Sequence, residues 1–116
     1  MNIRQVYERT AFEKELSEQR FCELASEAIE LIISQYGEKY TIGEKGSFDG
    51  IKTFNDSTDV FEEYMPSIAD YVLYRLGAAD RYELYALKAN NAYLNVWRRL
   101  SKGKAVKAKL GGEYFV

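Results

Sequence analysis

The residues able to do acid–base chemistry in this chain are carboxylates, and their spacing does not favour an active site. There is no histidine, so the commonest general base and transition-metal ligand is absent. Glu62 and Glu63 are adjacent and would point apart on a helix. Glu23 and Glu27 would share a helix face, but together with Glu30 they form a stripe typical of a solvated surface. We therefore expect no enzyme activity, no metal site and no cofactor.

The single cysteine, Cys22, also gives no indication of catalysis or metal binding. Cys22 follows Phe21 and precedes Glu23-Leu24 in a helical pattern, where a cysteine is usually a small buried apolar residue. One cysteine makes no internal disulfide, and without histidine nothing activates the thiol in the usual dyad.

No apolar run approaches the roughly 20 residues needed to cross a bilayer. The polar residues 1–5 lack the apolar stretch of a signal peptide. We expect a reducing compartment and no membrane.

The charges are unevenly distributed. Residues 1–83 carry a net charge of −8 and residues 84–116 a net charge of +6. Basic side chains at the C-terminal end suit three roles: neutralising a helix dipole, docking on an acidic partner, or following a phosphate backbone. No helix-turn-helix, zinc finger or base-reading pattern accompanies them. The residues suited to phosphate contact are Arg98, Arg99 and Lys102.

The elements that must position these residues fit one domain. The chain has 116 residues, of which 47% are hydrophobic and 29% charged, enough to bury a core. Ten tyrosines, six phenylalanines and one tryptophan are consistent either with a tyrosine-rich core or with a large contact surface.

Apolar spacing predicts a mainly α fold, a bundle of three or four helices. A short helix near Ile3 leads to Thr10–Glu13, which has the pattern of a capping box. The long helix that follows starts either near Ala11 or at Ser17 and ends at Gly37.

Two further helical regions follow. One begins near residues 58–59, is interrupted and renewed at Pro66, and ends at Gly77. The last helix runs from Ala79 to about Leu100. Its spacing of apolar residues predicts one apolar face, formed by Tyr82, Tyr85, Ala86, Ala89, Tyr93, Val96, Trp97 and Leu100.

Two segments differ from the helical body. Four glycines punctuate residues 37–58, which we expect to form a long loop or a small β-hairpin that acts as a contact arm. Residues 103–116 follow the helical domain of residues 1–102 and are expected to be an extended docking tail. The tail carries lysines among small or apolar residues and ends in two aromatic residues and a valine, and exposed apolar groups usually have a docking place. The alternative is that the tail folds back onto its own body as an edge strand.

Two stretches resemble the head–tail connector, or adaptor, proteins of tailed bacteriophages. The first, LSEQRFCELASEAI at 16–29, is similar to the family's opening helix. The second, IADYVLYRL at 68–76 with Asp80, Ala89, Ala92, Tyr93 and Trp97, is similar to its closing pair of helices.

The resemblance implies a structural virion protein, located in the neck between capsid and tail and assembled in the host cytoplasm. Such proteins form a homo-oligomeric ring, generally of twelve subunits, beneath the portal protein. The ring extends the channel through which DNA passes without sequence-specific binding, and it presents a surface to a downstream tail or neck protein. The alternative function is a small helical nucleic-acid-binding or regulatory protein that uses its basic C-terminal end.

Position and composition assign two sets of contact residues under this interpretation. The set expected to dock on the portal comprises Lys104, Lys107, Leu110, Tyr114, Phe115 and Val116. The set expected on the arm, facing a neighbouring subunit or the channel, comprises Lys45, Phe48, Ile51, Lys52 and Phe54.

Overall fold

A computed structural model gives the structure of residues 2–43, 47–52 and 59–111, with side chains as far as Ser101. The fold is mainly helical, as predicted, and the described residues contain no strand. Four α-helices follow in chain order: α1 (Ile3–Glu13), α2 (Glu18–Tyr36), α3 (Met65–Arg75) and α4 (Arg81–Gly111). A short 3-10 helix, η2 (Glu62–Tyr64), leads directly into α3.

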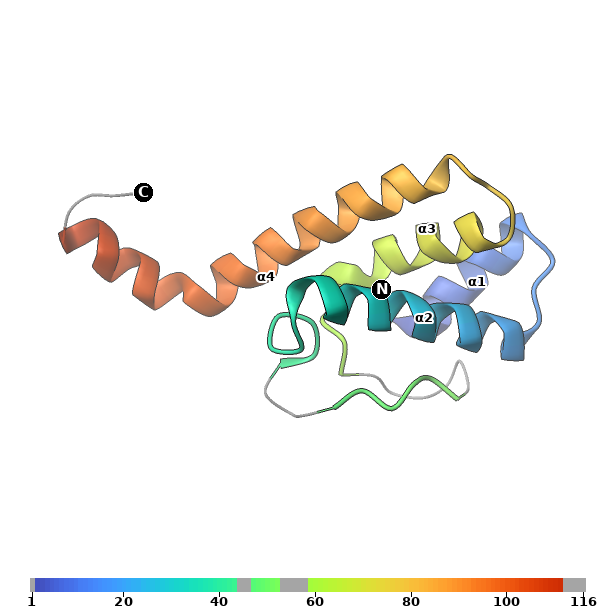
Figure 1. Ribbon diagram of the computed structural model, residues 1–116, viewed down its shortest axis with the longest axis horizontal. Coiled ribbons are helices and arrows are strands. Elements are labelled where there is room, and N and C mark those ends of the chain that lie inside the picture. Colours follow the sequence, from blue (N-terminus) through green and yellow to red (C-terminus); the bar gives the residue numbers. More distant parts are fainter. Residues whose placement is uncertain (1, 44–46, 53–58, 112–116) are drawn as a thin grey trace.

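Helix α3 is the centre of the fold. It contacts α1, α2, η2 and α4, and Figure 1 shows it between α2 and α4. Its side chains from Met65 to Leu73 are buried, with the exception of the half-buried Pro66. These buried residues point to all sides of α3, which agrees with its contacts to the other three helices.

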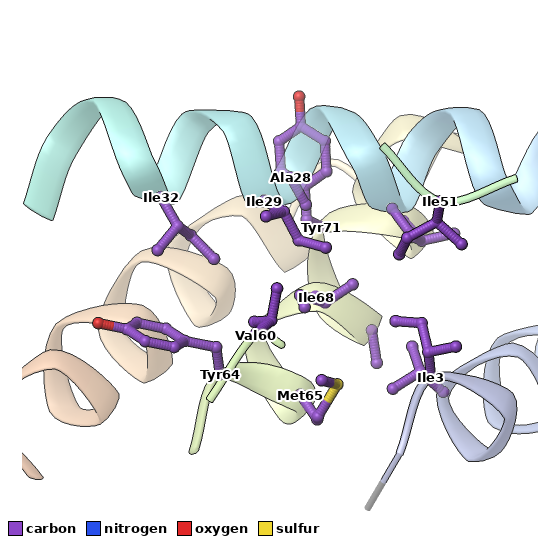
Figure 2. Close-up of a cluster of buried hydrophobic side chains, with 14 of the residues drawn as sticks. Ile3, Ala28, Ile29, Ile32, Ile51, Val60, Tyr64, Met65, Ile68 and Tyr71 are labelled. Carbon is purple, nitrogen blue, oxygen red and sulfur yellow. The ribbon is translucent and has the colours of Figure 1, made fainter. Parts of the chain in front are cut away.

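The core lies between α2, α3 and the loop segments that return beneath them. Figure 2 shows Ile29 of α2 pointing toward Ile68 of α3, with Ile32 on the side of Tyr64 and Ile51 of the loop on the other side. Phe21, Val72 and Val96 are also fully buried and extend this cluster to α4. Removing so many large apolar side chains from water is the main contribution to the stability of the fold.

The starts of the first two helices correct one prediction and settle another. Thr10 lies inside α1, where its hydroxyl donates to the carbonyls of Val6 and Tyr7 at 3.0 Å, so the predicted capping box at Thr10–Glu13 is wrong. The capping box is instead formed by Asn2 and Gln5. Helix α2 restarts after Ser17, whose hydroxyl oxygen accepts the Arg20 N–H at 3.2 Å.

The helical region predicted to begin near residues 58–59 begins a few residues further along the chain. Residues 59–61 are not helical and η2 is a single turn, so the α-helix itself begins only at Met65. Pro66 stands in the first turn, where its missing N–H costs nothing, as predicted. Gly37 ends α2 with a φ of +92°, and Gly77 follows α3 with a φ of +115°. These are backbone conformations that favour glycine.

The described part of segment 37–58 is an ordered loop, and the predicted hairpin does not appear in it. Ile42 and Ile51 are buried in the core instead of pairing as strands. The Ile51 N–H donates to the Ser26 hydroxyl of α2 at 2.8 Å, and the Tyr64 hydroxyl donates to the Tyr40 carbonyl at 2.7 Å. These contacts hold the loop against the helical body at Tyr40 and at Ile51.

The last helix extends beyond its predicted end. Residues 103–111 were expected to be extended, yet the backbone stays helical to Gly111: the stretch contains no proline, and Gly103 does not end the helix. Figure 1 shows this end of α4 projecting away from the other helices. The radius of gyration is 15.7 Å, compared with about 13 Å for a compact domain of this length, and the projection accounts for the excess.

Candidate functional site

Three of the carboxylates considered for acid–base chemistry, Glu23, Glu27 and Glu63, bind cations of their own chain. The Glu63 carboxylate accepts hydrogen bonds from two nitrogens of Arg99 at 2.9–3.1 Å, in a forked ion pair that joins η2 to α4. Glu23 pairs with Arg20 at 3.3 Å on the surface of α2. No group of three or more potential metal ligands occurs among the residues that the structure describes. Cys22 is buried, as its apolar neighbours predicted.

Glu27 is hydrogen-bonded to two side chains of a neighbouring helix. It accepts hydrogen bonds from the Tyr71 hydroxyl and from the Arg75 guanidinium, both on α3. The Tyr71 hydrogen bond, followed by that of Arg75, lowers the pKa of Glu27. Burial, assisted by the Glu27 contact, raises the pKa of Tyr71 to about 12, so Tyr71 remains a donor at ordinary pH. The arrangement fastens α2 to α3 and leaves no free base beside an acid.

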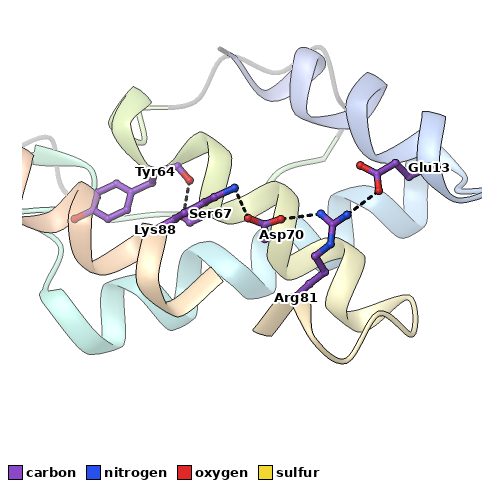
Figure 3. Close-up of polar contacts among 6 residues, drawn as sticks. All are labelled: Glu13, Tyr64, Ser67, Asp70, Arg81 and Lys88. Carbon is purple, nitrogen blue, oxygen red and sulfur yellow. Dashed lines mark hydrogen bonds and ion pairs between the residues drawn. The ribbon is translucent and has the colours of Figure 1, made fainter. Parts of the chain in front are cut away.

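A second charged cluster lies at the junction of three helices. Asp70 of α3 is 1% exposed, and its carboxylate lies 3.0 Å from an Arg81 nitrogen and 2.7 Å from the Lys88 ammonium (Figure 3). The Lys88 contact has the distance of an ion pair without the alignment of a hydrogen bond. Arg81 also binds Glu13 of α1 at 2.9 Å.

Sequence reasoning missed the cluster around Asp70. The available signal was an aspartate flanked by Ile68-Ala69 and Tyr71-Val72, in a helix whose other central residues are apolar. A buried carboxylate needs a partner, and here both partners come from α4. The Asp70 hydrogen bond raises the pKa of Arg81, which stays charged. The cluster is therefore a structural tie among α1, α3 and α4.

The residues predicted on the arm do not form one exposed site. Ile51 is buried in the core, Phe48 is half-buried against it, and Lys52 is exposed with its Nζ 3.4 Å from the Asp49 carbonyl. Lys45 and Phe54 lie outside the described residues. The described arm residues therefore bring chiefly Lys52 to the surface, and the proposed contact with a neighbouring subunit or the channel stays a prediction.

The residues predicted to contact phosphate are divided by their environments. Arg99 is held by Glu63, and its guanidinium stacks 5.0 Å from the centre of the Phe61 ring, beside a shallow open depression that Glu62 also lines. Arg98 is exposed, with only a 3.5 Å contact to Asn95 among the described residues. Lys102 lies in α4 beyond the described side chains. The charge of Arg99 is paired with Glu63, whereas that of Arg98 is not, so the two arginines do not form a single unpaired basic patch.

Three of the six residues predicted to dock on the portal belong to the projecting end of α4. Lys104, Lys107 and Leu110 are part of the helix, whereas Tyr114, Phe115 and Val116 lie outside the described residues. The docking assignment itself stays a prediction.

Helix α4 also presents a surface that the sequence pattern had not separated from its core face. Tyr85, Ala89, Ala92 and Val96 are buried. Four residues that were expected on the same face are exposed: Tyr82, Ala86, Trp97 and Leu100. Six of the seven exposed large apolar side chains among the described residues are on this helix. Four of them lie on the side of α4 opposite its buried residues, as the helical repeat of 3.6 residues requires. We define the outer face of α4 as Glu83, Leu84, Leu87, Asn90, Asn91, Leu94, Trp97 and Arg98, all exposed.

None of the described helices combines the length and the apolar character needed to cross a membrane. No protein-family model matches the chain, and no curated protein or solved structure matches it either.

Proposed function

We propose that this chain is a non-catalytic assembly subunit, a head–tail connector of a tailed bacteriophage that forms a ring beneath the portal. The observation that carries the proposal is the projecting end of α4. Residues 102–111 stay helical after the helix leaves the body, and they contain four lysines and no acidic residue. A basic helix with no core of its own is suited to docking on another protein, because its backbone is already ordered before it binds.

The helical body supports this role as a rigid base for the projection. The Glu63–Arg99 ion pair anchors α4 just before it leaves the body, and the Asp70 cluster fixes its other end to α3. The charged groups in these places are paired within the chain, which favours a structural function over catalysis.

The test is native mass spectrometry of the full chain mixed with the portal ring from the same genome. The expected result is the addition of about one copy per portal subunit, in keeping with a shared ring symmetry. The variant Lys104→Glu/Lys107→Glu should weaken this association by reversing two charges on the projection. The matched variant Arg9→Glu/Lys14→Glu changes the net charge equally on the body and should bind as the natural chain does.

The alternative is a nucleic-acid-binding protein that uses the basic end of the chain. It would be favoured if the chain ignored the portal, formed a discrete small oligomer and took up DNA with an affinity that fell steeply as salt increased. The engagement of Arg99 by Glu63 gives this alternative less support, because one of its proposed phosphate-binding residues is already paired.

A further inference from the structure

The outer face of α4 is self-complementary about its midpoint. Read in both directions from the Asn90–Asn91 pair, Leu87 corresponds to Leu94, Leu84 to Trp97 and Glu83 to Arg98. Every one of these side chains is exposed, and Leu87 reaches 58%. Side chains that recur at spacings of three and four residues form one stripe along a helix, so these eight residues make a continuous surface.

We infer that this face binds a second copy of the same chain, with the two α4 helices antiparallel and a two-fold axis between Asn90 and Asn91. In that arrangement Leu87 of each copy lies beside Leu94 of the other, and Leu84 and Trp97 cover the two flanks of this contact. Apolar residues then meet apolar residues on both sides of the axis, and the two asparagines form a polar centre whose amides can bond to each other.

Charge complementarity favours a second copy over an unrelated partner. The antiparallel arrangement brings Glu83 of one copy to Arg98 of the other at both ends of the contact. Glu83 makes no ion pair with any described residue, and the described contact of Arg98 is the 3.5 Å approach to Asn95 on its own helix. Both groups are therefore placed to pair across the axis. A parallel arrangement would set Glu83 against Glu83 and Arg98 against Arg98.

The inference stands apart from the connector role. A two-fold contact uses the same surface on both copies and closes at two, whereas a ring needs head-to-tail contacts between different surfaces. The pairing describes the free chain, and it leaves the loop and the projecting end of α4 outside the contact.

The test is sedimentation equilibrium of the full natural chain over a wide concentration range. We expect a monomer–dimer equilibrium. Leu87→Asp should raise the dissociation constant about tenfold or more, because it places a charge in the middle of the apolar stripe of both copies. Phe12→Asp is the matched control, since Phe12 is 91% exposed on α1, away from this face. It should leave the equilibrium unchanged.

The charge pair gives the sharper result. Glu83→Arg sets like charges against each other at both ends of the contact, and Arg98→Glu does the same with the opposite sign. Each should weaken the dimer, and the double variant Glu83→Arg/Arg98→Glu should restore it. Circular dichroism of each variant verifies that the helices remain. A natural chain that is monomeric at every concentration, a ring without a dimer, or a double variant no better than the single ones would overturn the inference.

Discussion

The carboxylate of Asp70 on α3 lies 2.7 Å from the ammonium nitrogen of Lys88 on α4, although Asp70 is almost fully buried. Arg81 binds the other carboxylate oxygen at 3.0 Å and reaches Glu13 of α1 through a second nitrogen. One buried negative charge thus fixes two positive side chains of the longest helix and, through one of them, the first helix of the chain.

Replacing Asp70 by asparagine should cost more stability than any surface substitution. The Asp70→Asn variant keeps the shape of the side chain but leaves Arg81 and Lys88 facing a neutral amide. Breaking a buried pair costs about 3–5 kcal/mol, and we expect the lower end because both cations keep partial access to water. Urea unfolding followed by circular dichroism measures the difference. An unchanged midpoint would contradict the structural role of the cluster.

The hydrogen bonds of Glu27 make stability depend on pH in a defined direction. Its pKa in the folded chain is lowered, whereas the unfolded carboxyl titrates near about 4.3. The unfolded state therefore binds more protons, and the contribution of Glu27 is fully present above the unfolded pKa and is lost as the pH falls through the folded pKa. Glu27→Gln should flatten the increase of unfolding free energy with pH in the acid range below the unfolded pKa.

At pH 7 the same substitution should cost less than about 1 kcal/mol, because the Glu27 carboxylate is half-exposed and screened by water. Tyr71→Phe is the companion variant, since it removes the first cause of the lowered pKa and should flatten the same part of the profile. Urea unfolding at a series of pH values gives both profiles. A Glu27→Gln variant with the natural slope would show that another carboxylate is responsible.

Local patterns predicted the helices well, because capping and periodicity act within a few residues. Ser17, Gly37, Pro66 and Gly77 all stand at helix ends, where their backbone preferences place them. The capping box at Thr10 failed because a threonine can also bond back to carbonyls inside a helix. Local sequence does not decide between the two uses of the hydroxyl.

The surfaces that depend on tertiary packing were not predictable in this way. Helix α4 carries large apolar residues on two faces, and only its contact with α3 shows that Val96 is buried and Leu87 is not. The same holds for Ile51, which was expected on a contact arm but fills the core, where the loop reaches Ser26 of α2. Contacts between residues far apart in sequence decided both cases.

Two glycines with positive φ should respond differently to alanine. Gly43 and Gly77 have φ of +82° and +115°, which costs any L-residue about 1–2 kcal/mol. A Cβ at Gly77 would meet nothing within 4 Å, whereas at Gly43 it would lie 3.3 Å from the Phe61 ring. The Arg99 guanidinium of α4 lies 5.0 Å from the centre of that ring, so a shift of the ring would disturb this contact.

Gly43→Ala should therefore cost about 1 kcal/mol more than Gly77→Ala. Thermal unfolding of both variants under the same conditions gives the comparison. Equal losses would mean that the Phe61 ring yields freely and that only the backbone conformation matters at Gly43.

Two buried tyrosines should respond with opposite signs to the loss of their hydroxyls. The Tyr64 hydroxyl donates to the Tyr40 carbonyl at 2.7 Å, and Tyr64→Phe should cost about 1 kcal/mol because it leaves that carbonyl without its donor. The buried Tyr85 hydroxyl has no hydrogen-bond partner among the described residues. Tyr85→Phe removes a hydroxyl that loses its hydration on folding and gains no hydrogen bond in return. The substitution should leave the free energy of unfolding unchanged or raise it by about 1 kcal/mol. Urea unfolding of the pair provides the test. A loss at Tyr85 as large as that at Tyr64 would show that the Tyr85 hydroxyl is hydrogen-bonded in solution.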